Sequence, residues 1–285
     1  MSKTGKAPDG RSTVEVSIMA FVERNMPRGA RDELTVEEPM EIRICREGMA
    51  DCRTISVTMR TPGRDVELSA GFLFTEGIIK SVEDILSIGH PGPDDPNSRN
   101  AVEASISDER YRESSGYTRS FNANSSCGVC GKSNINEIFL KGRKVIRSTL
   151  SVSASTILSL PGIMTGEQAI FSKTGGAHAA ALFSVEGKLL AVEEDVGRHN
   201  AVDKAIGKLL LGKLADPSGC ILQASGRAGF EIVQKAIVAG IPVISSVSAP
   251  TSLAVEAAEA FNATVIGFAR NGRFNVYTHS ERVVP

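Results

Sequence analysis

The chain has 285 residues, of which 41% are hydrophobic and 23% charged, a composition typical of a folded protein with one large domain or two smaller ones. Its 32 Lys and Arg residues balance 33 Asp and Glu residues, so the net charge of -1 gives no field that would recruit nucleic acid or an anionic membrane. No apolar stretch approaches the roughly 18 residues of a membrane-spanning helix, and the polar N-terminus lacks the apolar segment of a signal peptide. We therefore expect a cytoplasmic protein that binds neither nucleic acid nor membranes and that holds any anionic ligand in a local pocket.

The N-terminal part is predicted to be rich in β-structure. A flexible tail over residues 1–13 precedes three segments, 14–23, 40–48 and 51–60, in which apolar and polar residues alternate as they do in half-buried strands. Apolar residues then take helical spacing from Val66 to Leu86, with an interruption near Gly77. A turn-rich loop at 90–100 and a short strand at 102–106 complete a β-rich part that we place at residues 14–112.

Residues 113–134 contain many Ser, Asn and Gly residues and almost no aliphatic ones, so they are predicted to form an irregular, flexible loop. This loop carries the most closely spaced cysteines of the chain, Cys127 and Cys130. Long loops of this kind often carry function, and a cysteine pair at its centre favours a functional interpretation.

The remainder of the chain, residues 135–285, is predicted to be an α/β part. Three segments predicted to be strands or short helices come first, before Pro161, at 178–186 and at 188–196, and an amphipathic helix at 200–211 follows them. A β-α-β-α-β run follows, with strands at 220–225, 241–249 and 263–269 and helices at 230–240 and 251–262. Apolar strands that alternate with helices predict a largely parallel sheet covered on both faces, with ligands bound at the carboxyl ends of the strands.

The cysteine pair at Cys127 and Cys130 admits several chemistries. A structural zinc site needs four ligands, and the other cysteines, Cys45, Cys52 and Cys220, are isolated in the sequence, so we predict no metal site. A thioredoxin-like dithiol normally opens a helix directly after a strand, whereas this pair lies within a polar loop. A sulfur carrier, in which a mobile loop moves a persulfide from donor to acceptor, suits the position best. Because the count is odd and no export signal is present, we expect the cysteines to be mostly reduced.

A zinc-dependent deaminase would carry H-x-E followed by P-C-x-x-C. Here Ser126 precedes the pair, and the H-x-E sequence, His279 to Glu281, comes after it. The sequence therefore gives no support for deamination.

Polar clusters follow the strands of the α/β part. Gly176 and His178 lie in a glycine-rich turn whose backbone N–H groups could approach an anion, although a turn with a satisfied histidine explains them equally well. Asp195 and His199 could serve in acid–base chemistry, or in helix capping and an ion pair with Arg198. Ser225 and Arg227, residues 248–252 and residues 268–273 each follow a strand, and together they predict one crevice for a large phosphorylated ligand. No P-loop and no G-x-G-x-x-G sequence accompanies them.

These motifs together resemble the formate dehydrogenase accessory sulfurtransferase family, FdhD. The resemblance is carried by SCGVCGK (126–132), KTGGAHAAAL (173–182), EEDVGRHNAVDK (193–204), the long run from Ser225 to Glu256, and GFARNGRFNVYTH (267–279). The motifs occur in the order of the family and span roughly residues 60 to 280.

The resemblance implies a protein that takes sulfur from a cysteine desulfurase and hands it to the molybdenum cofactor, in its bis(molybdopterin guanine dinucleotide) form, before that cofactor enters formate dehydrogenase. It implies that Cys127 carries the persulfide, that Cys130 assists it, and that Phe268, Ala269, Arg270, Asn271, Gly272 and Arg273 bind the cofactor. It also implies a cytidine-deaminase-like, three-layer core and a homodimer. The alternative is a non-catalytic chaperone that binds the molybdenum cofactor for formate dehydrogenase.

Overall fold

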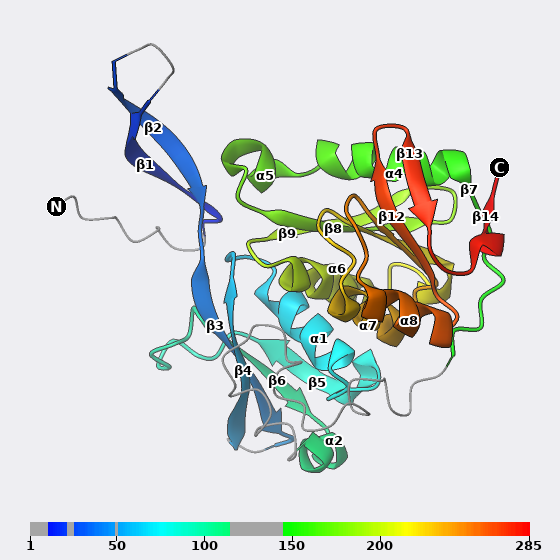
Figure 1. Cartoon of the computed structure of the whole chain (residues 1–285). Helices are drawn as coiled ribbons and strands as arrows, with labels where there is room; N and C mark the ends of the chain where they lie inside the picture. Colours follow the sequence, from blue (N-terminus) through cyan, green and yellow to red (C-terminus); the bar gives the residue numbers. More distant parts are fainter. Residues whose placement is uncertain (1–10, 22–25, 49–50, 115–144) are drawn as a thin grey trace.

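The computed structural model describes residues 11–21, 26–48, 51–114 and 145–285, and every structural statement below concerns these residues (Figure 1). The predictions made for residues 1–10 and for the segment that carries Cys127 and Cys130 lie outside them. Within the described part, helices and sheets stack in layers that bring the N-terminal and C-terminal parts together (Figure 1).

The N-terminal part is built on a four-stranded sheet of order β4-β3-β6-β5. Strand β3 (Glu38–Arg46) pairs antiparallel with β4 (Cys52–Arg60) and parallel with β6 (Ala101–Ile106), and β5 (Ile85–Gly89) pairs antiparallel with β6. Alternate residues of β3 and β6 face inward because strand side chains have a period of two, and these pack under helix α1 (Asp65–Thr75). The predicted β-rich part is thus present, with α1 as its inner cover.

Three details differ from the predicted elements of this part. The helical pattern from 66 to 86 breaks near Gly77 as predicted, where φ is +80°, but beyond Thr75 it gives only a 3-10 turn (Val82–Asp84) that leads into β5. A strand that the periodicity did not indicate, β2 (Arg28–Thr35), pairs antiparallel with β1 (Thr13–Ala20). A short helix, α2 (Asp108–Glu113), follows β6.

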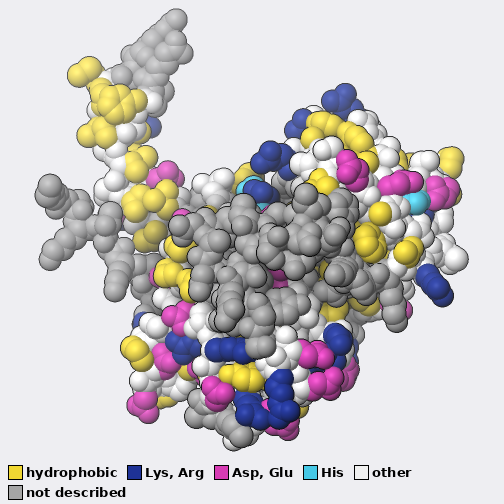
Figure 2. Space-filling model, turned by 60° about the horizontal axis from the view of Figure 1, so that its bottom comes forward, with side chains coloured by type: hydrophobic (Ala, Val, Ile, Leu, Met, Phe, Trp, Pro, Cys, Tyr) yellow, Lys and Arg dark blue, Asp and Glu magenta, His cyan; other side chains and the backbone are white. Residues whose placement is uncertain are grey.

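The β1–β2 ribbon extends away from the body of the molecule (Figure 1). Apolar side chains lie on its surface, as the space-filling view shows at the upper left (Figure 2), and they include Ile18, Met19 and Leu34. At its base, the Thr35 and Thr174 hydroxyl oxygens lie 2.7 Å apart, which ties the ribbon to helix α5 (Ala169–Thr174).

The C-terminal part is built on a six-stranded sheet of order β13-β12-β11-β10-β8-β9. Its strands are β8 (His178–Ser184), β9 (Leu189–Asp195), β10 (Cys220–Ala224), β11 (Val243–Ser246), β12 (Thr264–Arg270) and β13 (Arg273–Val276). Helices α6 (Arg198–Gly212), α7 (Phe230–Ala239) and α8 (Ser252–Ala260) cover one face, and α4 (Ala154–Gly166) covers the other. A short 3-10 turn (Pro217–Gly219) precedes β10. A last 3-10 turn (Ser280–Arg282) leads into β14 (Val283–Val284), which pairs with β7 (Val152–Ser153).

The prediction of a largely parallel sheet is wrong, because only two of the five strand pairs in this sheet are parallel. Only β10, β11 and β12 run parallel to one another, because α7 and α8 provide the long crossovers that parallel neighbours need. The pairs β8–β9 and β12–β13 are joined by tight turns and are therefore antiparallel, and β10 also runs antiparallel to β8. The segment before Pro161 is helical, and Pro161 lies inside α4.

The predicted fold class, α/β with a mixed sheet after a smaller β-rich part, is confirmed. The cytidine-deaminase-like character of the core and the domain boundaries at 14–112, 113–134 and 135–285 stay predictions.

Helices α1 and α6 join the two parts at very close range. A Cβ atom added at Gly71 would lie 1.9 Å from the carbonyl oxygen of Asp203, and one added at Gly207 would lie 1.8 Å from that of Glu67. Any larger residue at either position would force the helices apart, so glycine is required there for the contact.

A buried ion pair of the C-terminal part lies at the same junction and is hydrogen-bonded to the N-terminal part. Lys204 of α6 and Asp195 at the end of β9 are 2% and 0% exposed, and Lys204 Nζ lies 2.7 Å from Asp195 Oδ2. Lys204 also donates to the carbonyl oxygen of Thr61, and the Thr61 amide donates to Asp195 Oδ2. Asn200 donates to both Asp195 Oδ1 and the carbonyl oxygen of Met59. The loop after β9 is therefore held against the end of β4.

Replacing Lys204 by Met should destabilise the protein by about 3–5 kcal/mol, because the substitution leaves the Asp195 carboxylate buried without its cation. The free energy of unfolding from urea titration measures this effect. The matched control is Lys80→Met, since the Lys80 side chain is 65% exposed and its nearest carboxylate lies 3.9 Å away; little change is expected there. A loss below about 1 kcal/mol for Lys204→Met would show that the pair does not hold the junction.

Candidate functional site

One edge of the six-stranded sheet gathers most of the predicted site residues. Strand β8 begins at this edge and its antiparallel neighbours end there, so His178 pairs with Asp195 of β9, and Ala180 pairs with Ala224 of β10. Ser225 follows β10 directly, accepts a hydrogen bond from the Ala179 amide at 2.8 Å, and donates its own amide to the Ala179 carbonyl. The structure thus brings His178 and Ser225 side by side at the carboxyl ends of β9 and β10.

Hydrogen bonds join the loops after β10, β11 and β12 into one continuous rim. The Thr251 amide donates to the Ala228 carbonyl, and the Phe268 amide donates to the Ser248 carbonyl. The Ser246 hydroxyl donates to the Gly226 carbonyl. Each loop therefore supports its neighbour, as the predicted crevice requires.

A cavity of about 450 Å³ lies between this rim and the segment that joins α4 to α5. It brings together three of the predicted site residues, Gly176, His178 and Ser225. The other lining residues, which were not predicted as site residues from the sequence, are Met164, Thr165, Gln168, Phe171, Gly175, Ala177, Val196 and Val247. No Lys, Arg, Asp or Glu residue of the described part lines the cavity.

His178 is half-buried at this cavity, and its imidazole makes no hydrogen bond to any residue that the structure describes. Burial lowers the pKa of His178 below its ordinary value, and the nearby Arg198 and His199 lower that pKa further. A neutral imidazole can both donate and accept a hydrogen bond, so at neutral pH His178 offers the cavity one group of each kind.

Asp195 at the end of β9 and His199 in the first turn of α6 have partners in the fold. Asp195 pairs with Lys204 and not with Arg198, the partner considered from the sequence. His199 Nε2 lies 2.5 Å from a carboxylate oxygen of Glu231 at the start of α7. Asp195 and His199 are thus held by the fold, which favours the structural interpretation of both residues.

Two arginines lie at the rim or beside it, outside the cavity: Arg227 in the loop after β10 and Arg198 at the start of α6. Arg227 is exposed, and the Cδ atom of Arg198 would lie 3.7 Å from a Cβ atom added at Gly226. The same hypothetical Cβ atom would lie 3.5 Å from His178 Nδ1, so Arg198 and His178 flank one glycine. Guanidinium groups at such a position can bind phosphate bidentately.

The stretch from Phe268 to Arg273 forms the end of β12 and a tight hairpin rather than part of the cavity wall. Asn271 and Gly272 have φ values of +54° and +72°, as a two-residue hairpin turn requires, and they place Arg270 opposite Arg273. The Arg270 guanidinium lies 5.9 Å from the centre of the Phe268 ring. Ala269 is 1% exposed and packs in the core beneath α4, so its side chain is not available to a ligand.

The hairpin belongs to the same sheet edge, but it is set apart from His178. The strand order places β12 three positions from β8, which corresponds to roughly 14 Å at the usual spacing between strands. The residues predicted to form one crevice therefore lie in a row along the edge, with the cavity at one end and the hairpin arginines at the other.

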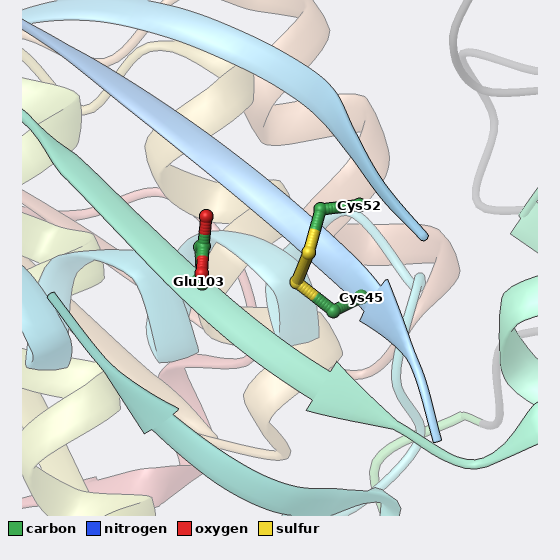
Figure 3. Close-up of side chains that lie close together, drawn as sticks. All are labelled: Cys45, Cys52 and Glu103. Atoms are coloured by element: carbon green, nitrogen blue, oxygen red, sulfur yellow. A yellow bond between two sulfur atoms is a disulfide. The ribbon is translucent and has the colours of Figure 1, made fainter. Parts of the chain in front are cut away.

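The cysteines within the described residues offer no accessible free thiol. Cys45 and Cys52 face each other across β3 and β4, with Cα atoms 4.0 Å apart, and their sulfur atoms are joined in a disulfide (Figure 3). Glu103 of β6 lies beside them. This pair differs from the expectation of mostly reduced cysteines, because pairing across the hairpin brings residues seven apart in sequence into contact.

Cys220 is the remaining described cysteine, and it is fully buried. Burial raises the pKa of its thiol to about 11, so it is not a thiolate near neutral pH. Cys127 and Cys130 are left as the candidates for sulfur chemistry, and they lie outside the described residues.

The lowered pKa of His178 predicts that the protein becomes less stable as the pH falls. Its pKa in the folded protein lies below that in the unfolded chain, so the unfolded chain binds the proton first as the pH falls, and stability decreases below about pH 6.5. We expect the wild-type protein to lose more of its free energy of unfolding between pH 7.5 and pH 5.5 than the His178→Gln variant, as measured by urea titration. Parallel pH profiles for the two proteins would contradict this assignment.

None of the helices in the described part of the chain combines the length and the apolar composition that a membrane-spanning segment needs.

Comparison with known proteins places the chain in a family. Residues 35–284 match the model of the FdhD/NarQ family. The chain is 46% identical over 253 residues to the sulfur carrier protein FdhD of Picrophilus torridus, covering 89% of this chain and 92% of the relative. It is 48% identical over 255 residues to the sulfur carrier protein FdhD of Thermoplasma volcanium, covering 90% of each chain.

The fold also has a counterpart among solved structures. The crystal structure of a protein described as a formate dehydrogenase accessory protein from Desulfotalea psychrophila matches with a TM-score of 0.74 and 24% identity, covering 96% of this chain and all of that one. At this level of identity the match concerns the fold. Because the family model and the relatives both span most of the sequence, the chain belongs to the FdhD/NarQ family.

Proposed function

We propose that this protein is a sulfur carrier that moves sulfur, as a cysteine persulfide, from a cysteine desulfurase to the molybdenum cofactor of formate dehydrogenase. Relatives that match about nine-tenths of the chain are named sulfur carrier protein FdhD. The observation that carries the assignment to particular residues is that Cys45, Cys52 and Cys220 are all unavailable as thiolates. Cys127 and Cys130 remain for the transfer.

Cys127 is the proposed carrier. Its thiolate attacks the terminal sulfur of the desulfurase persulfide, the bond between the two sulfur atoms of the donor breaks, and the donor cysteine leaves as a thiolate. Lys132 and the glycines beside the pair favour the thiolate form of Cys127. Cys130 assists the release of sulfur to the acceptor or resolves the persulfide.

The acceptor is proposed to be the bis(molybdopterin guanine dinucleotide) form of the cofactor, bound along the sheet edge as a substrate. Its phosphates suit the guanidinium groups of the rim, contributed by Arg198, Arg227, Arg270 and Arg273. Phe268, Asn271 and Gly272 would contact the cofactor at the hairpin, with Ala269 contributing only through its backbone. Gly176, His178 and Ser225 would contact it at the cavity. The protein is further proposed to act in the cytoplasm as a homodimer that delivers the cofactor to formate dehydrogenase.

A cofactor-binding chaperone without sulfur chemistry is the alternative. The cavity and the rim are built from residues other than the cysteines, so they could bind a ligand in the absence of sulfur transfer. The two functions differ in whether Cys127 gains sulfur.

Incubation of the full chain with a cysteine desulfurase and cysteine should add the mass of about one sulfur atom, and a thiol reductant should remove it. Intact-protein mass spectrometry on wild type, Cys127→Ala and Cys130→Ala tests this. We expect Cys127→Ala to lose the gain and Cys130→Ala to retain it. Cys220→Ala is the matched control and should load like wild type, because the Cys220 thiol is buried.

Failure of the wild-type protein to gain sulfur, together with retained binding of the cofactor, would favour the chaperone. Loading that persists in Cys127→Ala and is lost in Cys130→Ala would assign the carrier role to the second cysteine.

A further inference from the structure

Cys45, Cys52 and Glu103 come together on the outer face of the four-stranded sheet (Figure 3). The inward side chains of β3 and β6 pack under α1, whereas Cys45 and Glu103 occupy alternate positions and so lie on the opposite face. Cys45 is paired with Cys52 of β4 and with Ser105 of β6, and Glu103 precedes Ser105 by two residues. The cluster therefore draws one side chain from each of three adjacent strands, β4, β3 and β6.

The ligand atoms of these three residues lie close enough to share one cation. The two sulfur atoms and a carboxylate oxygen of Glu103 all lie within 4.8 Å of one another. Tetrahedral zinc with Zn–S bonds of about 2.3 Å holds two sulfur atoms roughly 3.8 Å apart. Once the disulfide is opened, each cysteine side chain can turn about its Cα–Cβ bond to reach that separation while the strands stay paired.

The Glu103 carboxylate has an acceptor to spare. Arg43 Nη1 donates to Glu103 Oε1 at 3.1 Å, and this is the carboxylate's one hydrogen bond within the described residues. A disulfide has no hydrogen to donate, so the sulfur atoms beside Glu103 do not satisfy its second oxygen. Arg43 also donates to Asp95 at 2.6 Å, and a guanidinium fixed in this way orients the carboxylate, as partners of metal ligands commonly do.

The cluster opens into a cavity of about 790 Å³ between the outer face of the sheet and the loop that follows β5. Cys45, Cys52 and Glu103 line this cavity together with His90 and Asp95. A metal ion and its water can therefore reach the sulfur atoms from solvent. The cavity belongs to the four-stranded sheet and is distinct from the site at the edge of the six-stranded sheet.

We propose that the reduced protein binds one Zn²⁺ ion through the thiolates of Cys45 and Cys52 and the carboxylate of Glu103, and that the disulfide is the oxidised form of the same site. Two thiolates beside one carboxylate suit zinc, whereas Mg²⁺ and Ca²⁺ prefer oxygen ligands alone. Three protein ligands leave one tetrahedral position open toward the cavity for water. No metal site was predicted from the sequence because these cysteines are isolated along the chain, and it is the pairing of β3 with β4 that brings them together.

A dithiol reductant converts the oxidised form into the reduced one. Its first thiolate attacks one sulfur atom of the disulfide and breaks the bond between Cys45 and Cys52. Its second thiolate then displaces that protein sulfur, so the reductant leaves as a disulfide and two electrons and two protons pass to the protein cysteines. Zn²⁺ replaces the two protons when it binds.

This inference does not depend on the proposed function. The sulfur atoms of Cys45 and Cys52 are engaged in both forms, by each other in the disulfide and by the metal in the reduced protein. Cys127 and Cys130 therefore remain the candidates for sulfur transfer in either form.

Cobalt binding to the full-length protein tests the site, because Co²⁺ occupies tetrahedral zinc sites and its sulfur-to-metal charge-transfer absorption reports thiolate ligands. The parent protein for this test carries Cys127→Ala and Cys130→Ala, so that the other cysteine pair cannot bind the metal. The protein is reduced with a dithiol, which is then removed without exposure to oxygen. We expect one equivalent of Co²⁺ to bind with this absorption and one equivalent of Zn²⁺ to displace it.

Three variants of the parent protein make the test specific. Replacing Cys45 and Cys52 together by Ser should abolish the charge-transfer absorption. Glu103→Gln should weaken zinc binding by roughly tenfold or more, since even the outer partners of metal ligands contribute about 10–100-fold in affinity. Glu109→Gln is the matched control and should bind zinc like the parent, because Glu109 is exposed on α2 and lies outside the cluster. Reoxidation of the parent to the disulfide should release the ion.

The proposal is overturned if the reduced parent binds no cobalt, if the absorption persists without Cys45 and Cys52, if Glu103→Gln leaves the zinc affinity unchanged, or if the oxidised protein binds zinc as tightly as the reduced one. Glu103 lies outside the hydrophobic core, so its variant decides the question even where the cysteine variant fails to fold. The outcome is separate from that of the sulfur carrier test, because sulfur loading is measured on protein that retains Cys127.

Discussion

The buried pair of Asp195 and Lys204 is the constraint on which the arrangement of the site depends. It lies where β9 ends and α6 passes, and both partners also bond to Thr61 at the end of β4. Both partners belong to the C-terminal part, so separating the two parts of the chain would remove the Thr61 groups that satisfy this buried pair and leave its hydrogen-bonding groups unpaired. The short loop after Asp195 leads directly into α6, and Arg198 at the start of this helix lies near Gly226 together with His178. The position of Arg198 therefore depends on how α6 is held at this junction.

The register of β10 and β11 places the residues just beyond these strands, Ser225 and Val247, in the wall of the cavity. On the α4 face of the sheet, β10 and β11 carry core residues at their first positions, buried polar side chains in the middle, and the cavity-lining residues Ser225 and Val247 just beyond the strands. Because Ile157 and Leu160 of α4 pack with the core residues of this face while Met164 in its last turn lines the cavity, the same face changes from core to cavity wall within a few residues. This separates a cavity without charged residues in its described lining from the arginines outside it.

Much of this architecture could be predicted from the sequence. Strands β3, β4 and β6, and the alternation of strands and helices from β10 to β12, were predicted from the spacing of apolar residues. The sequence predicted only that His178 and Ser225 lie near polar clusters of the α/β part. Their proximity depends on the antiparallel pairing of β8 with β10, which the residue pattern of neither strand specifies. The pairing of Cys45 with Cys52 could have been found by aligning the two predicted strands across their turn.

Other features had no signal in the sequence. Pro161 lies inside the continuous helix α4, where the sequence predicted only a strand or short helix before the proline. The Asp195–Lys204 pair depends on how the end of β9 meets α6, so nothing in local spacing identifies the partner. Cys127 and Cys130, by contrast, were identified from sequence alone, and the contribution of the structure is to show that the described cysteines do not compete with them.

The central claim is that sulfur carried on Cys127 passes to a cofactor held on the same protein. A single-turnover experiment with ³⁵S tests it most directly: the protein is loaded with labelled persulfide, freed of the desulfurase and mixed with the molybdenum cofactor, and the cofactor is then separated from the protein. The account predicts that label leaves Cys127 and appears in the cofactor fraction at the rate at which the cofactor becomes able to activate formate dehydrogenase. Label that stays on the protein while the cofactor activates the enzyme would contradict the account.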